Sequence, residues 1–175
     1  MLYPLSRPDL VLIDADVFLN LFHGNASVLS EIEMLRKAGV QVNLTQWAFY
    51  EVLQQALQRL PTEIARREVA ARQLAMHHLR IGVNQVPPDN RLKVSLLVEM
   101  AARRYNNQGQ FTQFRISQKD HPHFAEAFQT HARLWSHDHS NQEAKDFARY
   151  IQVEMYQPTT PITRPTGRNN DEILS

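Results

Sequence analysis

The 175-residue chain contains no cysteine, and its charges of opposite sign nearly cancel. The absence of cysteine excludes a disulfide framework, a thiolate zinc site and a cysteine nucleophile. Long hydrophobic runs are also missing: the run from Leu10 to Ile13, for example, ends at Asp14, whereas a bilayer-spanning helix needs about 20 apolar residues. The first residues lack the basic and apolar regions of a secretory signal. The sequence therefore predicts a cytoplasmic protein with no membrane contact.

The composition is that of one globular domain. Hydrophobic residues make up 43% and charged residues 21% of the chain, which excludes wholesale disorder. A chain of this length suits one domain and is too short for two of full size. We expect a single domain over residues 1–157. Residues 158–175 are rich in proline and threonine and are predicted to be an extended or disordered tail.

The net charge of +1 hides an uneven distribution along the chain. Residues 1–58 and 120–175 each carry a net charge of −3, whereas residues 59–119 hold eleven basic and only four acidic side chains. A basic middle between acidic ends is typical of a protein that binds a polyanion on one surface and a metal cation elsewhere. An arginine-rich helix that only faces solvent remains the alternative.

Apolar residues recur with the spacing of alternating strands and helices. Residues 10–13 read as a buried strand, and residues 40–44 alternate as a second strand. Helical spacing predicts helices over 17–22, 27–37, 45–60, 62–78, 92–105, 122–132 and 143–156, the second capped by Ser27 and the third by Thr45. Residues 111–116 fit either a strand or an extended insertion. This order predicts an α/β/α sandwich around a mainly parallel sheet.

Acidic residues follow the predicted strands. Asp14 and Asp16 come directly after the first strand, and Glu51 lies in the first turns of the helix after the second. If the two strands are parallel neighbours, Glu51 faces Asp14 across the carboxyl edge of the sheet, where sites form in such folds. A buried carboxylate needs a compensating charge, and Mg²⁺ and Mn²⁺ favour oxygen ligands. A solvated glutamate is the alternative reading of Glu51.

Two segments of the sequence resemble blocks of the PIN-domain nucleases, in particular the small toxin nucleases of toxin–antitoxin operons. Residues 10–24 (LVLIDADVFLNLFHG) are similar to the opening strand and helix of that family, and residues 42–53 (VNLTQWAFYEVL) to its second block. A looser third block comprises residues 120–128 (DHPHFAEAF) and residues 134–138 (LWSHD). The resemblance implies a PIN-like fold.

Carried over residue by residue, the resemblance assigns a metal site. Asp14, Glu51, Asp120 and Asp138 would be the catalytic acids and would hold one or two Mg²⁺ or Mn²⁺ ions, with Glu99 as a rival for the place of Asp120. Asp16 and Ser136 would lie just outside the metal's ligands. The basic residues Arg66, Arg67, Arg103 and Arg104 would bind phosphates without reading sequence.

The resemblance also implies an activity and partners. The expected function is a metal-dependent endoribonuclease that acts on RNA phosphodiesters and forms a homodimer. The resemblance also implies a role as the toxin of a pair with an antitoxin protein.

Three other functions fit parts of the sequence. Asp14-Ala-Asp16 also fits the first motif of haloacid-dehalogenase-like phosphatases, with Asp14 as nucleophile. The pairs His121/His123 and His137/His139 offer imidazoles suited to zinc. A PIN-like module without catalysis, which binds RNA or a protein, is the non-enzymatic alternative.

Overall fold

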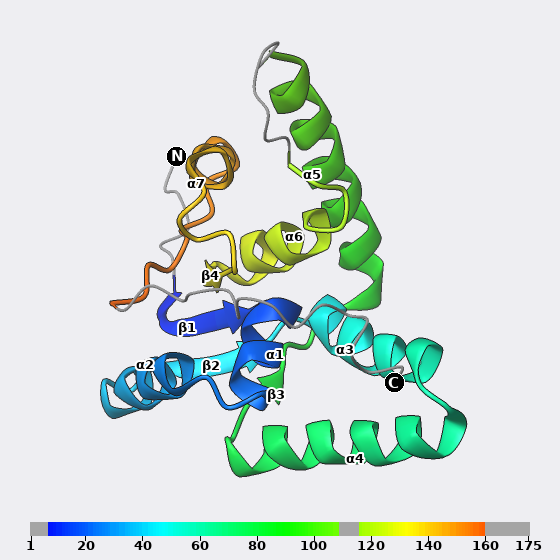
Figure 1. The fold of residues 1–175 in the computed structure, drawn as a ribbon. Helices are drawn as coiled ribbons and strands as arrows, with labels where there is room; N and C mark the ends of the chain where they lie inside the picture. The colour runs from blue at the N-terminus through cyan, green and yellow to red at the C-terminus, as the bar shows by residue number, and fades with distance from the viewer. Residues whose placement is uncertain (1–6, 109–115, 160–175) are drawn as a thin grey trace.

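The computed structural model, which describes residues 7–108 and 116–159, contains a four-stranded sheet in which all strands are parallel (Figure 1). The strand order is β3-β2-β1-β4. The strands are β1 (Arg7–Ile13), β2 (Gln41–Leu44), β3 (Gly82–Val83) and β4 (Ala132–Trp135). The helices are α1 (Ala15–Phe22), α2 (Ala26–Lys37), α3 (Gln46–Arg59), α4 (Thr62–His78), α5 (Pro88–Gln108), α6 (His121–Thr130) and α7 (Gln142–Tyr150).

The central strand β1 is buried on both faces because helices cover each side of the sheet. Successive strand residues point to opposite faces. Val11 and Ile13 accordingly pack in one hydrophobic cluster with residues of α1, α2 and α3. Leu10 and Leu12 pack in a second cluster with residues of α5, α6 and α7. The predicted α/β/α arrangement with a parallel sheet is therefore confirmed.

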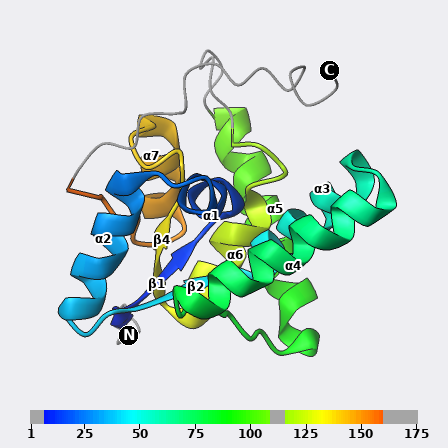
Figure 2. The ribbon, with the colours of Figure 1, turned by 60° about the horizontal axis from the view of Figure 1, so that its bottom comes forward.

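Helices α3 and α4 form a hairpin that extends beyond the sheet in both views (Figures 1 and 2). Arg72 of α4 joins the two helices, because its Nη1 donates to the Val52 carbonyl of α3 at 2.5 Å. Its Nε donates to Glu68 of the same helix at 3.2 Å, which holds the guanidinium in place. Its guanidinium also lies over the Phe22 ring, 5.7 Å from the ring centre. Part of the basic charge in the middle of the chain is therefore structural and buried.

Several predicted element boundaries differ from the structure. Asn25, not Ser27, caps α2, since its Oδ1 accepts hydrogen bonds from the backbone N–H groups of Ser27 and Val28. Strand β3 has only two residues, too few for an alternation pattern. Helix α5 begins at Pro88 and reaches Gln108, longer at both ends than predicted. Residues 111–116 are predicted as either a strand or an extended insertion, and residues 111–115 of this segment lie outside the described residues.

The predicted helix 143–156 ends at Tyr150, and the chain that follows runs alongside β4. Gln152 has a φ of 62°, a left-handed backbone conformation that ends helical hydrogen bonding. The Leu134 N–H then donates to the Glu154 carbonyl and the Tyr156 N–H to the Leu134 carbonyl, both at 2.9 Å. This backbone pairing adds a short extended segment to the outer edge of the sheet.

A buried carboxylate on α2 fixes the end of that segment. Glu31 is 4% exposed and accepts a hydrogen bond from the Tyr156 hydroxyl. It also accepts bonds from the Thr159 N–H at 3.1 Å and the Thr159 hydroxyl at 2.6 Å. Thr159 lies in the predicted tail 158–175, of which residues 160–175 fall outside the described residues. In the described ranges, no helix combines the length and the apolar character needed to cross a membrane.

Candidate functional site

The carboxyl ends of three strands meet at one edge of the sheet. The backbone N–H of Asp14, which follows β1, donates to the Trp135 carbonyl at the end of β4 at 3.2 Å. The N–H of Thr45, which follows β2, donates to the Ile13 carbonyl at the end of β1 at 3.0 Å. Polar residues that are remote in the sequence therefore lie next to one another at this edge.

Asp14 is a buried carboxylate, 3% exposed, at the start of α1. Its Oδ1 caps the helix by accepting from the Val17 N–H at 2.9 Å. Its Oδ2 accepts from both the backbone N–H and the ring Nδ1 of His137, each at 3.0 Å. Burial raises the pKa of Asp14, but the hydrogen bond from His137 and the charges of His123 and His137 outweigh it and lower the pKa overall.

The His137 ring lies among three carboxylates. Besides its contact with Asp14, its Nδ1 is 3.1 Å from Asp16 Oδ2, and its Nε2 is 3.2 Å from Asp138 Oδ2. Burial lowers the pKa of His137, but the hydrogen bond to Asp14 and the charges of the three carboxylates raise it to about 9. His137 is therefore a cation at neutral pH.

A second histidine, His123 of α6, lies between β2 and the acid on α3. Its Nδ1 is 2.8 Å from Thr45 Oγ1, the hydroxyl that caps α3, and its Nε2 is 3.5 Å from Glu51 Oε2. Burial lowers the pKa of His123, but the hydrogen bond to Glu51 and the charges of Asp14, Glu51 and Asp120 raise it. Asp14 and Glu51 therefore both raise the pKa of the same buried imidazole. The two carboxylates do not point to opposite sides of the molecule.

Asp120, which precedes α6, shares this charged environment. Burial raises its pKa, and although His123 and His137 oppose this shift, Asp138 and Asp14 add to it, to give a pKa of about 6. Asp120, Asp138 and Ser136 line one pocket together with residues of the following loop and of α7. The charges of Asp14 and Asp138 therefore act on Asp120, although the three acids are far apart in the sequence.

Ser136 and Asp138 belong to the turn after β4. Ser136 is buried, and its hydroxyl accepts from the Asp138 N–H at 3.2 Å. This contact fixes the turn that presents Asp138. Glu99, the rival for the place of Asp120, is instead on α5, where it pairs with Arg103 at 2.5 Å and acts on the pKa of His121.

The four predicted phosphate-binding arginines are exposed and divide between two helices. Arg66 and Arg67 are on α4, where Arg67 pairs with Glu63 at 2.8 Å, and Arg103 and Arg104 are on α5. Figure 1 shows α4 below the sheet, and α5 runs upward on the other side of it. The two pairs therefore lie on helices at different sides of the sheet.

The histidines considered as a zinc site have different partners. His121 lies near Glu99 and Arg103 of α5, and the ring of His139 is 3.2 Å from the Ser136 carbonyl. His123 and His137 contact acids from separate elements. Within residues 7–108 and 116–159, no three histidine or acidic side chains are arranged to hold a metal ion.

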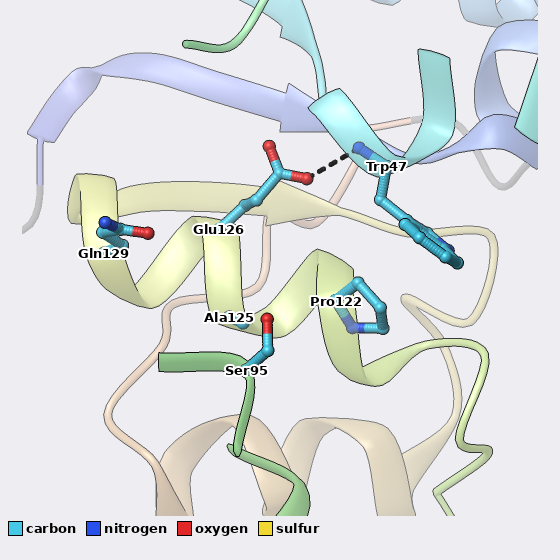
Figure 3. Close-up of a pocket in the computed structure, with 6 residues that line it drawn as sticks. All are labelled: Trp47, Ser95, Pro122, Ala125, Glu126 and Gln129. Atoms are coloured by element: carbon cyan, nitrogen blue, oxygen red, sulfur yellow. Dashed lines mark hydrogen bonds between the residues drawn. The ribbon is translucent and has the colours of Figure 1, made fainter. Parts of the chain in front are cut away.

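Sequence reasoning missed Glu126, a buried carboxylate of α6 that anchors the start of α3. It accepts from the Gln46 N–H at 2.6 Å, from the Trp47 N–H at 2.9 Å and from Asn84 Nδ2 at 3.1 Å. Figure 3 shows it beside a pocket lined by Trp47, Ser95, Pro122, Ala125 and Gln129. His123 and Glu126 are three residues apart on α6, a helical spacing that places them on one face. Through the hydrogen bonds of Glu126, this face of α6 holds the start of α3, the helix that carries Glu51.

Replacement of Glu126 by alanine should lower the free energy of unfolding by about 2–4 kcal/mol, because it leaves two backbone N–H groups of α3 and the Asn84 amide without their acceptor. Urea unfolding monitored by circular dichroism measures the loss. Glu63→Ala, which removes an exposed carboxylate with one surface partner, is the control and should change stability by less than about 0.5 kcal/mol. Equal stability of the two variants would contradict the anchoring role.

The donors at this edge match a hard divalent cation in chemical type. Asp14, Glu51, Asp120 and Asp138 offer carboxylate oxygens, the ligands that Mg²⁺ and Mn²⁺ prefer. The imidazoles of His123 and His137 lie among them and contact Glu51, Asp14 and Asp138. The carboxylates therefore suit a divalent metal in type and charge. In this structure, however, the side chains of Asp14, Glu51 and Asp138 contact the two histidines.

Comparison with known proteins adds one likeness. No family model matches the chain, and no curated protein is similar to it. Among solved structures, a chain of VapBC-1 from nontypeable Haemophilus influenzae matches 86% of this chain and 99% of its own length, with a TM-score of 0.58 and 15% sequence identity. At this identity the match concerns the fold. Together with the parallel sheet and its helical layers, it confirms the expected resemblance: the chain has a PIN-like α/β fold.

Proposed function

We propose that this protein is a metal-dependent endoribonuclease in which Asp14, Glu51, Asp120 and Asp138 hold one or two Mg²⁺ or Mn²⁺ ions. The observation that carries the proposal is the charge coupling of acids from different elements at one sheet edge. Burial is the main cause that raises the pKa of Asp120 to about 6, and the charges of Asp138 and Asp14 add to the shift. Such repulsion between carboxylates is unfavourable unless a cation is shared among them.

The chain's own residues would each contribute to this site. When bound, such an ion activates a water for in-line attack on a phosphodiester and stabilises the charge that develops there. Thr45 and His123 hold Glu51 in place, and the Ser136 hydroxyl fixes the turn that presents Asp138. Asp16 lies at the rim, with a side chain about half exposed, and contacts the His137 ring.

The proposed substrate is RNA, bound through its phosphates. Arg66, Arg67, Arg103 and Arg104 are exposed and supply charge without base recognition. We assign single-stranded or structured RNA in preference to duplex DNA by analogy with the family that the sequence resembles. RNA affinity that does not change when Arg103 and Arg104 are both replaced by alanine would remove them from the interface.

The fold match also supports a toxin role. VapBC-1 is a toxin–antitoxin complex, and we propose that this chain likewise pairs with an antitoxin protein. The exposed side chains of Leu96, Leu97 and Met100 on α5 offer an apolar face for the expected homodimer. Sedimentation of the purified protein at the mass of one chain would exclude that dimer.

Two other candidates are less well supported. A phosphatase would need Asp14 as a free nucleophile, but both oxygens of Asp14 accept hydrogen bonds from the chain. A binding module without catalysis would account for acids whose partners are histidines. It is the main alternative outcome of the following experiment.

The test is incubation of the purified protein with a mixed RNA pool and Mg²⁺, Mn²⁺, Zn²⁺ or chelator. We expect fragments to appear with Mn²⁺ or Mg²⁺, none with chelator, and none for Asp138→Asn. Bound but intact RNA in every condition would support the binding module. Hydrolysis of a small phosphomonoester with the RNA intact would support the phosphatase, and cleavage with zinc alone would indicate a histidine site.

A further inference from the structure

The position of His137 is the feature of the site that the proposed function does not explain. Its Nδ1 contacts Asp14 and Asp16, and its Nε2 contacts Asp138. Both ring nitrogens therefore face carboxylates at 3.0–3.2 Å, and the ring fills the space between these side chains.

The same contacts occupy the oxygen atoms that a metal would need. Asp14 Oδ1 accepts the N–H of Val17, and Oδ2 accepts both the backbone N–H and the ring of His137. Asp138 Oδ2 faces the other side of that ring. The ring therefore lies between Asp14 and Asp138, two of the four proposed ligands, and is 20% exposed, so it has a route toward solvent.

We infer that the His137 ring occupies the space between Asp14 and Asp138 and that a divalent ion must displace the ring to bind there. The inference rests on the proposed metal site and adds a competitor to it. The seated ring bridges these acids, and it weakens metal binding by the free energy needed to break its three contacts. Binding of the metal and seating of this ring are mutually exclusive.

The experiment measures Mn²⁺ binding by isothermal titration calorimetry, and thermal unfolding in chelator, for the wild type, His137→Asn and His137→Ala. Asparagine keeps a hydrogen-bond donor near Asp14 without the ring, and thus covers a folding failure of the alanine variant. The matched control is His131→Asn, because His131 is exposed, follows α6 with a φ of 56° and contacts none of the acids by an ion pair, and asparagine tolerates that backbone conformation.

We expect His137→Asn to bind Mn²⁺ at least about tenfold more tightly than the wild type and to unfold several degrees lower in chelator, whereas His131→Asn changes neither. Weaker Mn²⁺ binding by His137→Asn would indicate that His137 is a ligand and would overturn the inference. Equal Mn²⁺ binding by the variant and the wild type would overturn it too. Absence of Mn²⁺ binding in all variants would instead refute the proposed metal site. Mn²⁺ binding that is detected only after His137 is replaced would support both the proposed metal site and the inference about His137.

Discussion

Asp14→Asn is expected to reduce RNA cleavage by roughly 10³-fold or more, because loss of several kcal/mol of charge stabilisation at the reacting phosphate corresponds to that factor. The variant should still fold. Asparagine keeps an oxygen that can cap α1 through the Val17 N–H, as Asp14 Oδ1 does. Its amide nitrogen, however, would face two donors of His137, where Asp14 Oδ2 now accepts. That mismatch should cost about 1–3 kcal/mol of stability.

Measurement of both properties separates catalysis from folding. Initial cleavage rates with Mn²⁺ and urea unfolding curves are recorded for the same preparations. Asp146→Asn is the matched control: this half-exposed acid of α7 contacts Gln142 at 2.8 Å and Arg149 at 3.4 Å, both on its own helix, and its replacement should alter neither property. Cleavage by folded Asp14→Asn at the wild-type rate would exclude Asp14 from the reaction. If that variant does not fold, Asp138→Asn provides the same comparison from the turn after β4.

The metal-free protein is expected to lose stability as the pH rises above neutrality. The pKa of His137 is about 9 in the folded chain and about 6.5 in the unfolded chain. The folded state therefore binds this proton more tightly, so its contribution is complete below pH 6.5 and is lost as the pH rises through 9. After allowance for the partial exposure of the ring, the loss is on the order of 2 kcal/mol.

Two carboxylates extend this profile toward acid. The pKa of Asp120 is raised to about 6, so it too favours folding most when protonated, and its contribution disappears as the pH rises through 6. The pKa of Asp14 is lowered, so its contribution is present above the ordinary pKa of about 4 and is lost as the pH falls. Maximum stability is therefore expected at mildly acidic pH.

Urea midpoints in chelator from pH 5 to pH 10 test this profile. His137→Asn should remove most of the fall between pH 6.5 and 9.5, whereas His131→Asn should keep it. A wild-type profile that is flat across this interval would show that the His137 ring does not carry the charge that its three contacts require.

The strand and helix pattern carried much information about the fold. The buried run that ends at Asp14 and the alternation of residues 40–44 sufficed for two adjacent parallel strands, because such strands need continuous or alternating apolar residues. β3 could not be found this way, since two residues contain no period. The end of α7 at Tyr150 was missed because the apolar spacing continues into Val153 and Tyr156, which pack in the core as an extended segment.

The site was predictable in outline and not in its contacts. The parallel sheet brings the ends of β1, β2 and β4 together, and this topology predicted that Asp14 and Glu51 share one edge. Asp120, Asp138 and Ser136 were assigned to that edge only through the resemblance to PIN-domain nucleases. The roles of His123 and His137 depend on which ring faces which carboxylate, a matter of packing between α6, the turn after β4 and α1. From the sequence alone, such histidines can be interpreted only as metal ligands or exposed residues. In the structure they contact the acids.

The segment that follows α7 has a consequence for self-association. It covers the free side of β4 through the hydrogen bonds of Leu134 with Glu154 and Tyr156, and Glu31 holds its far end. The opposite border of the sheet is β3, only two residues long. An unprotected, lengthy border strand invites intermolecular ladder formation and aggregation. With one border capped and the other minimal, copies of this protein are expected to meet through helix surfaces.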